Sequence, residues 1–368
     1  MHVLLTGNTT FKIANFREGL LKKLIEDHHK VTVLSPSDNY VSKIKELGAE
    51  HKEIRMDRNG ISPLREFLLL FSIFMYIRQI RPEIVFSYTI KNNIYSGIAC
   101  RILNIPFAPN VTGLGPAFDK KGLFSSLIRL LYRVSASRAM VVFFQNPDDL
   151  KTCVSAGIVP KERARLLPGS GVDLMRFQKA ELPSADDRVI FLMVARLLWS
   201  KGVGQFVEAA EEIRKNHPNA IFRILGPIDH DSKDSVQLAD VDNWSDEGIV
   251  EYLGVTENVL PHLYEAHCVV LPSYYREGTP RSLIEASAIG RPVITTNIPG
   301  CRDLVVNGET GILVKPKDAA SLAIACIEFL GMSQYDRNAM GQKGAERVAT
   351  HYDEKIVINS YIDLFGKI

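Results

Sequence analysis

The sequence predicts an α/β fold with mainly parallel sheets, divided into two domains. Short apolar runs that suit buried strands alternate with segments of helical periodicity along the whole chain. At 368 residues the chain is longer than one hydrophobic core usually supports, so two domains of about 170 to 180 residues are expected. With 46% hydrophobic and 23% charged residues and no low-complexity run, both domains should be globular.

Candidate strands recur in both halves of the chain. In the first half they are residues 2–6, 30–35, 84–86, 107–111 and 139–145, with helical stretches at 16–27 and 64–79. In the second half they are residues 189–194, 220–225, 250–252, 268–271, 293–296 and 311–314, with a helix at 205–216. The apolar run 67–77 is about half as long as a membrane-spanning helix requires, so we expect a buried helix there.

The domain boundary is predicted at residues 168–185, whose first part is dense in Pro, Gly and Asp. This places an N-terminal domain at 1–167 and a C-terminal domain at 186–350. Residues 1–167 carry 24 Lys and Arg against 14 Asp and Glu, a net +10, and residues 168–368 carry 20 against 28, a net −8. A basic domain suits an anionic partner, and because no nucleic-acid motif is present, we expect a membrane surface or a lipid diphosphate.

One stretch of the basic domain, residues 120–133, mixes apolar residues with cations that include Lys120 and Lys121. It could rest on lipid headgroups, or it could be a domain helix with one packed and one solvated face. The amino terminus lacks a cationic lead and a long apolar centre, so we expect a cytoplasmic protein without a secretory signal. The five cysteines are widely spaced and odd in number, which fits buried reduced thiols.

The most informative segment is 276–294, which places Glu277 and Glu285 eight residues apart around a helix start at Pro280. The amides of Gly278, Thr279 and the first turn are predicted to bind an anion at the positive end of the helix dipole. The two carboxylates would be about 12 Å apart in a continuous helix, which roughly matches a diphosphate between two polyols. The alternative is a loop acid and a surface helix acid with no shared role.

A second cluster follows the predicted strand 189–194, where Arg196 and Lys201 lie in the loop before the next helix. Ligands bind at the carboxyl ends of the strands in an open parallel sheet. The two cations are therefore predicted to neutralise charge on a departing nucleotide diphosphate. The alternative is that both cations are solvated loop residues without a ligand. The pair of glutamates at 277 and 285 makes this alternative the weaker one.

Together these motifs resemble glycosyltransferase family 4, the retaining sugar-nucleotide transferases of the GT-B architecture. The matching residues are Arg196, Lys201-Gly202, Gly254-Val255, the E-x7-E spacing from Glu277 to Glu285, 290–294 and 307–311. The resemblance implies two Rossmann-like domains with mainly parallel sheets that face a central cleft. It also implies that a C-terminal helix at about 351–368 crosses back onto the first domain.

The resemblance further implies roles for individual residues. Glu277 would contact the donor sugar, Glu285 the ribose, and Arg196 and Lys201 the diphosphate. Main-chain groups at Gly254 and Val255 would receive the base. The remaining nucleotide-sugar-binding candidates are Gly278, Thr279 and Pro280, together with Gly7 and Asn8 after the first strand. The acceptor-side candidates are Thr9, Thr112 and Gly113, where Thr112 occupies about the place at which many relatives have a histidine.

A narrower resemblance concerns segments 86–93, 110–115 and 168–173, which are similar to the subgroup that extends polyprenyl-diphosphate-linked saccharides with N-acetylhexosamines. It implies transfer of N-acetylglucosamine or N-acetylgalactosamine from a UDP-sugar in bacterial surface-glycan or glycoprotein-glycan assembly. The enzyme would be peripheral on the inner face of the plasma membrane and would need no metal or other cofactor. The alternatives are a UDP-sugar 2-epimerase of GT-B architecture and a catalytically silent nucleotide-sugar-binding protein.

Other chemistries are less well supported by the sequence. The segments that begin at Gly113 and Gly169 start like dinucleotide fingerprints but have Phe118 and Leu174 at the third glycine position, which disfavours a dehydrogenase. Asp229 and Asp231 lie in a polar loop, where solvated turn carboxylates are expected rather than metal ligands. No Gly-x-Ser-x-Gly elbow is present to support a hydrolase.

Overall fold

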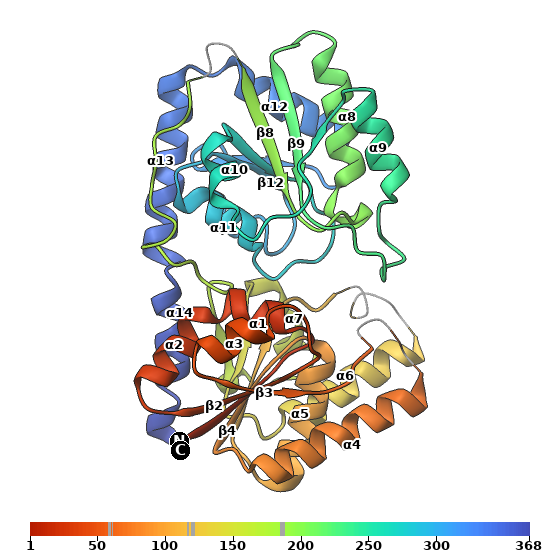
Figure 1. Ribbon diagram of the computed structural model, residues 1–368, viewed down its shortest axis with the longest axis vertical. Coiled ribbons are helices and arrows are strands. Elements are labelled where there is room, and N and C mark those ends of the chain that lie inside the picture. The colour runs from red at the N-terminus through yellow and green to blue at the C-terminus, as the bar shows by residue number, and fades with distance from the viewer. Residues whose placement is uncertain (58–59, 61, 116–117, 119–121, 185–187) are drawn as a thin grey trace. The chain divides into compact units, whose positions relative to one another are not determined.

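The computed structural model describes residues 1–57, 60, 62–115, 118, 122–184 and 188–368. The chain forms two compact units, of which unit 1 comprises Met1–Ser170 with Glu354–Ile368 and unit 2 comprises Gly171–Asp353 (Figure 1). Each unit contains one sheet with every strand pairing parallel, so the predicted α/β fold with Rossmann-like units is confirmed. Among the helices of the described residues, none combines the length and the apolar character needed to cross a membrane.

Unit 1 is built on a seven-stranded sheet of order β3-β2-β1-β4-β5-β6-β7. Its strands are β1 (His2–Thr6), β2 (Lys30–Ser35), β3 (Glu50–Glu53), β4 (Ile84–Tyr88), β5 (Phe107–Val111), β6 (Val142–Phe144) and β7 (Ala164–Leu166). Its α-helices are α1 (Thr10–Phe16), α2 (Glu18–Glu26), α3 (Val41–Glu46), α4 (Pro63–Ile80), α5 (Ile90–Leu103), α6 (Leu123–Ala136), α7 (Pro147–Ser155) and α14 (Glu354–Ile362).

Helices cover both faces of this sheet (Figure 1). Along β1, Leu4 packs into one apolar core with α4, α5 and α6, whereas Val3 and Leu5 pack into the other with α1, α2, α3 and α14. This alternation follows from the two-residue period of a strand buried on both faces. The C-terminal helix α14 belongs to this second core, where the buried Tyr361 ring packs 4.8 Å from both Phe86 and Phe143.

Unit 2 is built on a six-stranded sheet of order β10-β9-β8-β11-β12-β13. Its strands are β8 (Val189–Val194), β9 (Ala220–Leu225), β10 (Glu251–Tyr252), β11 (Cys268–Leu271), β12 (Val293–Thr296) and β13 (Gly311–Val314). Its α-helices are α8 (Val203–Arg214), α9 (Leu238–Asp246), α10 (Leu260–Glu265), α11 (Arg281–Ala288), α12 (Ala319–Gly331) and α13 (Gln334–His351). The short 3-10 helices of the chain are η1 (Lys161–Arg163), η2 (Trp199–Lys201) and η3 (Phe365–Lys367).

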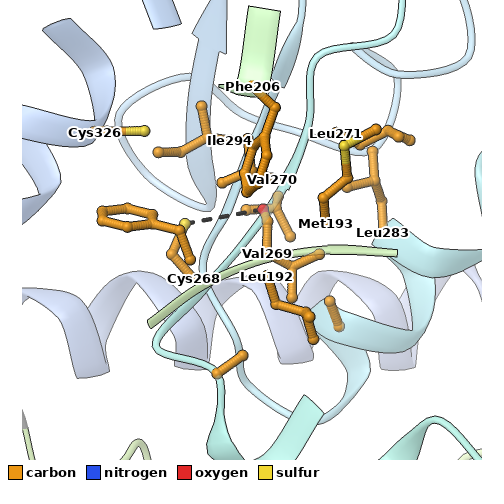
Figure 2. Close-up of a cluster of buried hydrophobic side chains, with 14 of the residues drawn as sticks. Leu192, Met193, Phe206, Cys268, Val269, Val270, Leu271, Leu283, Ile294 and Cys326 are labelled. Carbon is orange, nitrogen blue, oxygen red and sulfur yellow. Dashed lines mark hydrogen bonds between the residues drawn. The ribbon is translucent and has the colours of Figure 1, made fainter. Parts of the chain in front are cut away.

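The unit 2 core is continuous from the central strands to the helices. Figure 2 shows side chains of β8, β11 and β12 packed in one cluster with Phe206 of α8 and Leu283 of α11. Phe191 on β8 stacks on Phe222 of β9 with ring centroids 4.9 Å apart. All five cysteines are buried, as the sequence predicts, including Cys268 and Cys326 in this core.

The structure differs from the sequence-based expectation at several elements. The helix expected at 16–27 is α2, and the preceding helix α1, which the sequence did not predict, is separated from it at Arg17, where φ is −131°. The edge strands β3 and β7 are absent from the prediction, since β3 has the polar sequence Glu-His-Lys-Glu and β7 has only three residues. The apolar run 67–77, expected to form a buried helix, lies in α4, which is buried on only one face.

The buried Arg291 connects three parts of unit 2. Its guanidinium donates to the carbonyls of Leu263 at 3.0 Å, Ala180 at 3.1 Å, Glu181 at 3.0 Å and Tyr264 at 3.2 Å. Burial lowers the pKa of Arg291 to about 10, which leaves the group charged at neutral pH. From the sequence, Arg291 is recognised only as part of the end of a helix. In the structure it also holds the start of unit 2 against α10.

We expect the substitution Arg291→Met to lower the free energy of unfolding by about 3 kcal/mol or more, because several buried carbonyls lose their donor. The measurement is urea unfolding followed by circular dichroism. Arg188→Met, at an exposed position of the same unit, is the matched control and should change the unfolding free energy by less than about 0.5 kcal/mol. Equal effects of the two substitutions would contradict this role of Arg291.

Candidate functional site

The candidate site of unit 2 lies at the carboxyl ends of two central strands, β8 and β11. These strands are hydrogen-bonded neighbours although β9 and β10 intervene in the sequence, so the strand order reverses between them. The loops that leave the sheet at such a reversal diverge and leave room for a ligand. The loop after β8 carries Arg196 and Lys201, and the loop after β11 carries Glu277.

Lys201 and Glu277 form a buried ion pair across this reversal. The Lys201 ammonium donates to Glu277 Oε1, and the two side chains are only 15% and 11% exposed. Ser273 Oγ, fully buried, donates to the same carboxylate oxygen at 2.9 Å. The Lys201 ammonium also lies 5.5 Å from the centre of the Tyr275 ring. Two residues that are 76 positions apart in sequence thus form one charged centre.

Backbone contacts hold the Lys201 turn against the loop after β11. The Ser200 carbonyl accepts from the amides of Tyr274 at 2.9 Å and Tyr275 at 3.0 Å. Gly202 has φ +83°, and a Cβ there would lie 2.2 Å from the Pro272 carbonyl oxygen. A larger residue at position 202 would therefore prevent the close contact between the loops after β8 and β11. Asp234 accepts from both the amide and the hydroxyl of Ser200, which fixes the turn from its other side.

The segment between Glu277 and α11 is buried and closely packed. A Cβ at Gly300 would lie 1.8 Å from the Gly278 carbonyl oxygen, so the loop after β12 packs directly on this backbone. Gly278, Thr279 and Pro280 are all buried, and Pro280 is the residue before the first turn of α11. The residues of α11 and its N-cap are all described, and no side-chain hydrogen bond caps this N-terminus, where the positive end of the helix dipole lies.

Glu285 lies on α11, one turn beyond Arg281, which donates to it at 2.8 Å. Both side chains are 14% exposed. Burial raises the pKa of Glu285, while the charge and hydrogen bond of Arg281 oppose that rise. The structure therefore places the second glutamate on the same helix whose start follows Glu277, but it pairs Glu285 with an arginine that the sequence reading did not single out.

Arg196 differs from Lys201 in its surroundings. Its guanidinium donates to Asp229 at 2.6 Å, and its side chain is 51% exposed. Burial, and then the charge of Glu277, raise the pKa of Tyr275, and the nearby positive charge of Arg196 opposes this rise. An exposed pair of this kind contributes at most about 1 kcal/mol, so Arg196 can exchange Asp229 for another anion at little cost.

Gly254 and Val255 follow β10 in the same row of strand ends. The Gly254 carbonyl accepts from the amide of Gly226 at 2.8 Å, and Gly226 in turn follows β9. A Cβ at Gly226 would lie 1.9 Å from the Ala195 carbonyl oxygen, beside Arg196. The loops after β8, β9 and β10 are thus in direct contact, and Val255 is 67% exposed at their edge.

In unit 1, the predicted residues also follow strand ends. Gly7 packs closely on Ile13, and Thr9 caps α1 by accepting from the Lys12 amide at 3.2 Å. Asn8 accepts from the Lys12 ammonium at 3.3 Å. Thr112 and Gly113 are half-buried after β5, and Gly113 has φ +116°. These positions lie in a different unit from the Lys201–Glu277 pair.

Segments 86–93 and 110–115 are connected by a buried hydrogen-bond network. Ser87 donates to Asn93 at 2.7 Å, and Asn93 donates to the Asn110 carbonyl at 2.9 Å. Asn110 then donates to the Tyr361 hydroxyl at 3.0 Å. The polar residues in these two motifs therefore join β4, α5 and β5 to α14 and hold the loop that carries Thr112.

Several residues of the site were not predicted from the sequence. Ser273 and Asp234 orient Glu277 and the Lys201 turn through tertiary contacts, and Gly300 permits the close approach to Gly278. A polar residue two positions after the apolar run at 268–271, just beyond Pro272, is a signal that could have indicated Ser273. No local pattern distinguishes Asp234 or Gly300 from ordinary loop residues.

The chain matches known families and proteins in both halves. Residues 2–146 match the glycosyl transferase 4-like model, and residues 175–347 match the model of glycosyl transferases group 1. Over 372 residues the chain is 27% identical to the N,N'-diacetylbacillosaminyl-diphospho-undecaprenol alpha-1,3-N-acetylgalactosaminyltransferase of Campylobacter jejuni, with 97% of this chain and 96% of that protein covered. It is 28% identical over 288 residues to the UDP-Gal:alpha-D-GlcNAc-diphosphoundecaprenol alpha-1,3-galactosyltransferase of Escherichia coli, with 73% and 71% covered.

Solved structures share the fold over the full length. Anabaena Alr3699/HepE in complex with UDP and glucose has a TM-score of 0.80 at 16% identity and covers 100% of this chain and 99% of its own. A glycosyltransferase from Rickettsia africae has a TM-score of 0.77 at 16% identity, with 100% and 98% covered. The sequence relatives favour a transferase over the epimerase and the silent binding protein. The chain belongs to the glycosyltransferases of the GT-B fold, with a glycosyl transferase 4-like domain followed by a group 1 domain.

Proposed function

We propose that this glycosyltransferase moves an N-acetylhexosamine from a UDP-sugar to a polyprenyl-diphosphate-linked saccharide and retains the anomeric configuration. The observation that carries the proposal is the buried Lys201–Glu277 pair at the strand reversal of unit 2. The relatives from Campylobacter jejuni and Escherichia coli, whose names describe transfer to diphospho-undecaprenol saccharides, support the choice of acceptor class.

In this proposal, the donor binds along the strand ends of unit 2. Lys201 and Arg196 bind the diphosphate together with the uncapped start of α11, where Gly278, Thr279 and Pro280 lie. Glu285 accepts from the ribose hydroxyls. The base lies against the main chain at Gly254 and Val255, and Glu277 accepts from hydroxyls of the transferred sugar.

The reaction then breaks the bond between the anomeric carbon and the diphosphate oxygen, and the electron pair leaves with the UDP. The acceptor hydroxyl attacks the anomeric carbon from the same face, and its proton passes to an oxygen of the leaving phosphate. Lys201 and Arg196 stabilise the negative charge that develops on the diphosphate. Because these cations and the helix start supply positive charge, the proposal includes no metal ion. Glu277 positions the sugar and forms no covalent bond with it.

The proposal gives unit 1 the acceptor. Thr9, Thr112 and Gly113 are its candidate contacts, and Gly7 and Asn8 are further candidates for binding the nucleotide sugar. Thr9 and Asn8 already accept hydrogen bonds from Lys12, so a ligand that binds there would meet an organised turn. Thr112 offers a hydroxyl where the family resemblance implies an imidazole, and no step of the proposed reaction passes through an imidazole.

The direct test is a transfer assay with UDP-N-acetylglucosamine, UDP-N-acetylgalactosamine and a polyprenyl-diphosphate-linked saccharide. We expect a product extended by one N-acetylhexosamine in an α linkage, identified by mass spectrometry and by the NMR coupling of its anomeric proton. Incubation with each UDP-sugar alone tests the epimerase alternative. A β-linked product would rule out retention, and interconversion of the UDP-sugars without acceptor would support the epimerase.

Nucleotide preference is tested by a thermal-shift panel of UDP, GDP and ADP sugars. A ligand that binds only the folded protein raises its stability, by about 2.7 kcal/mol at 100 times its dissociation constant. We expect a rise in the melting temperature with UDP-hexosamines and none with GDP or ADP sugars at equal concentration. Equal shifts with all three nucleotides would argue against recognition of uracil.

The ion pair is tested by Lys201→Met and Glu277→Ala. Loss of one group that stabilises the leaving charge costs roughly 10²- to 10³-fold in kcat, so we expect Lys201→Met to fall in that range. Glu277→Ala should also lose turnover, because the sugar is no longer held. Lys215→Met, which removes an exposed lysine of the same unit, should retain activity.

Removing one partner of a buried pair also destabilises the fold, so unfolding must be measured for both variants. Folded Lys201→Met or Glu277→Ala protein with unchanged turnover would remove that residue from the mechanism.

A further inference from the structure

Helix α4 of unit 1 exposes a continuous apolar stripe. Leu64, Phe67, Leu68, Phe71 and Met75 are between 42% and 69% exposed. Their spacing of three, four, seven and eleven residues from the first places them on one side of the helix. The opposite side, with Leu69, Ile73 and Ile77, is buried in the unit 1 core. The helix is therefore apolar on both sides, but only one side has a partner within the described part of unit 1.

Helix α6 repeats this feature. It buries Tyr132 and small residues, and it exposes Leu123, Phe124, Leu127 and Leu130 by between 50% and 92%. Both α4 and α6 pack against α5, so the three helices form one layer on the same face of the sheet (Figure 1). The two stripes thus belong to the outer surface of a single layer, which we call the α4–α6 surface.

The charges on these helices are almost all positive. Helices α4 and α6 carry Arg65, Arg78, Arg129 and Arg133, and their one acid is Glu66. Glu66 accepts from the Lys91 ammonium at 2.6 Å and from the Tyr95 hydroxyl, so its charge is already offset. Residues 62–138 contain ten Lys and Arg against three Asp and Glu, a net +7.

The partners of these arginines leave most of the positive charge in place. Arg133 donates to the carbonyls of Ala156 and Gly157, and Arg129 donates to the Phe118 carbonyl, so no carboxylate neutralises either one there. Arg65 lies 3.6 Å from Asp57 in an exposed pair, which contributes little. Lys120 and Lys121, which the sequence places before α6, lie outside the described residues.

We infer that the α4–α6 surface docks on an anionic lipid bilayer, with α4 lying in the plane of the headgroups. Exposed aromatic and aliphatic side chains beside arginines fit a boundary where acyl chains meet anionic headgroups. A second copy of the chain fits less well, because a two-fold contact would bring the same arginines together with only the paired Glu66 on these helices. The inference rests on the proposed function, in which the acceptor is anchored in the membrane.

The test is co-sedimentation of the full-length protein with vesicles of phosphatidylglycerol and phosphatidylcholine, compared with phosphatidylcholine alone. We expect binding at least about tenfold tighter with the anionic vesicles, and weaker binding as salt rises. The double substitution Phe67→Asp/Phe71→Asp should reduce binding at least about tenfold, because two apolar side chains no longer enter the bilayer. Arg78→Glu should reduce binding to the anionic vesicles only.

Ile324→Asp is the matched control, since Ile324 on α12 of unit 2 is 67% exposed and lies outside the α4–α6 surface. Its vesicle binding should equal that of the parent. Activity on a water-soluble, short-chain acceptor should be unchanged in the Phe67→Asp/Phe71→Asp protein, which shows that the variant is folded.

Parent-like vesicle binding of the double variant would overturn the inference. A shift from dimer to monomer without any loss of vesicle binding would do so as well, and would assign the surface to a second copy. Vesicle binding that responds to the substitutions in a protein that extends no lipid-linked acceptor would refute the proposed function and leave the docking surface standing.

Discussion

The arrangement of unit 2 depends on one constraint, the burial of Lys201 and Glu277 as a contacting pair. Removing two charges from water costs several kcal/mol for each ion, and their attraction offsets that cost only where further hydrogen bonds complete the site. Ser273 supplies one such bond to Glu277. The contacts around Ser200 and the close approach at Gly202 hold the loops after β8 and β11 together, and the close approach at Gly300 packs the loop after β12 on Gly278, next to Glu277.

The two cations of the site are held in different ways, and the difference fits the proposed reaction. Lys201 is fixed in a buried pair, whereas Arg196 is half-exposed and paired with a single loop carboxylate. A fixed cation provides preorganised positive charge at no cost during the chemical step. In the proposed mechanism, the half-exposed Arg196 exchanges Asp229 for a phosphate oxygen and returns to Asp229 when the product departs. In the proposed mechanism, the site thus combines a permanent charge with an exchangeable one.

In unit 1, the buried polar network and the exposed apolar side chains lie in two different regions. The interior network from Ser87 through Asn93 and Asn110 to Tyr361 joins the central strands to the C-terminal helix α14. Such a network is stable in a buried setting only because its members satisfy one another. The outer layer instead leaves apolar side chains exposed on α4 and α6, which a domain without a partner for them would be expected to bury.

The sequence by itself determined the fold class and most strand positions, and it predicted that Lys201 and Glu277 belong to one candidate site, whereas their direct ion pair is visible only in the tertiary structure. These predictions were possible because period, strand length and helix-start signals are local, and because the strand ends of a parallel sheet share one edge. Only the tertiary structure decided that Ser273 and Asp234 hold the site, that Arg291 joins α10 to the start of unit 2, and that α4 is exposed on one face. Those features depend on contacts between residues far apart in the chain. An apolar helix reads the same in sequence whether one of its faces or both of them are covered.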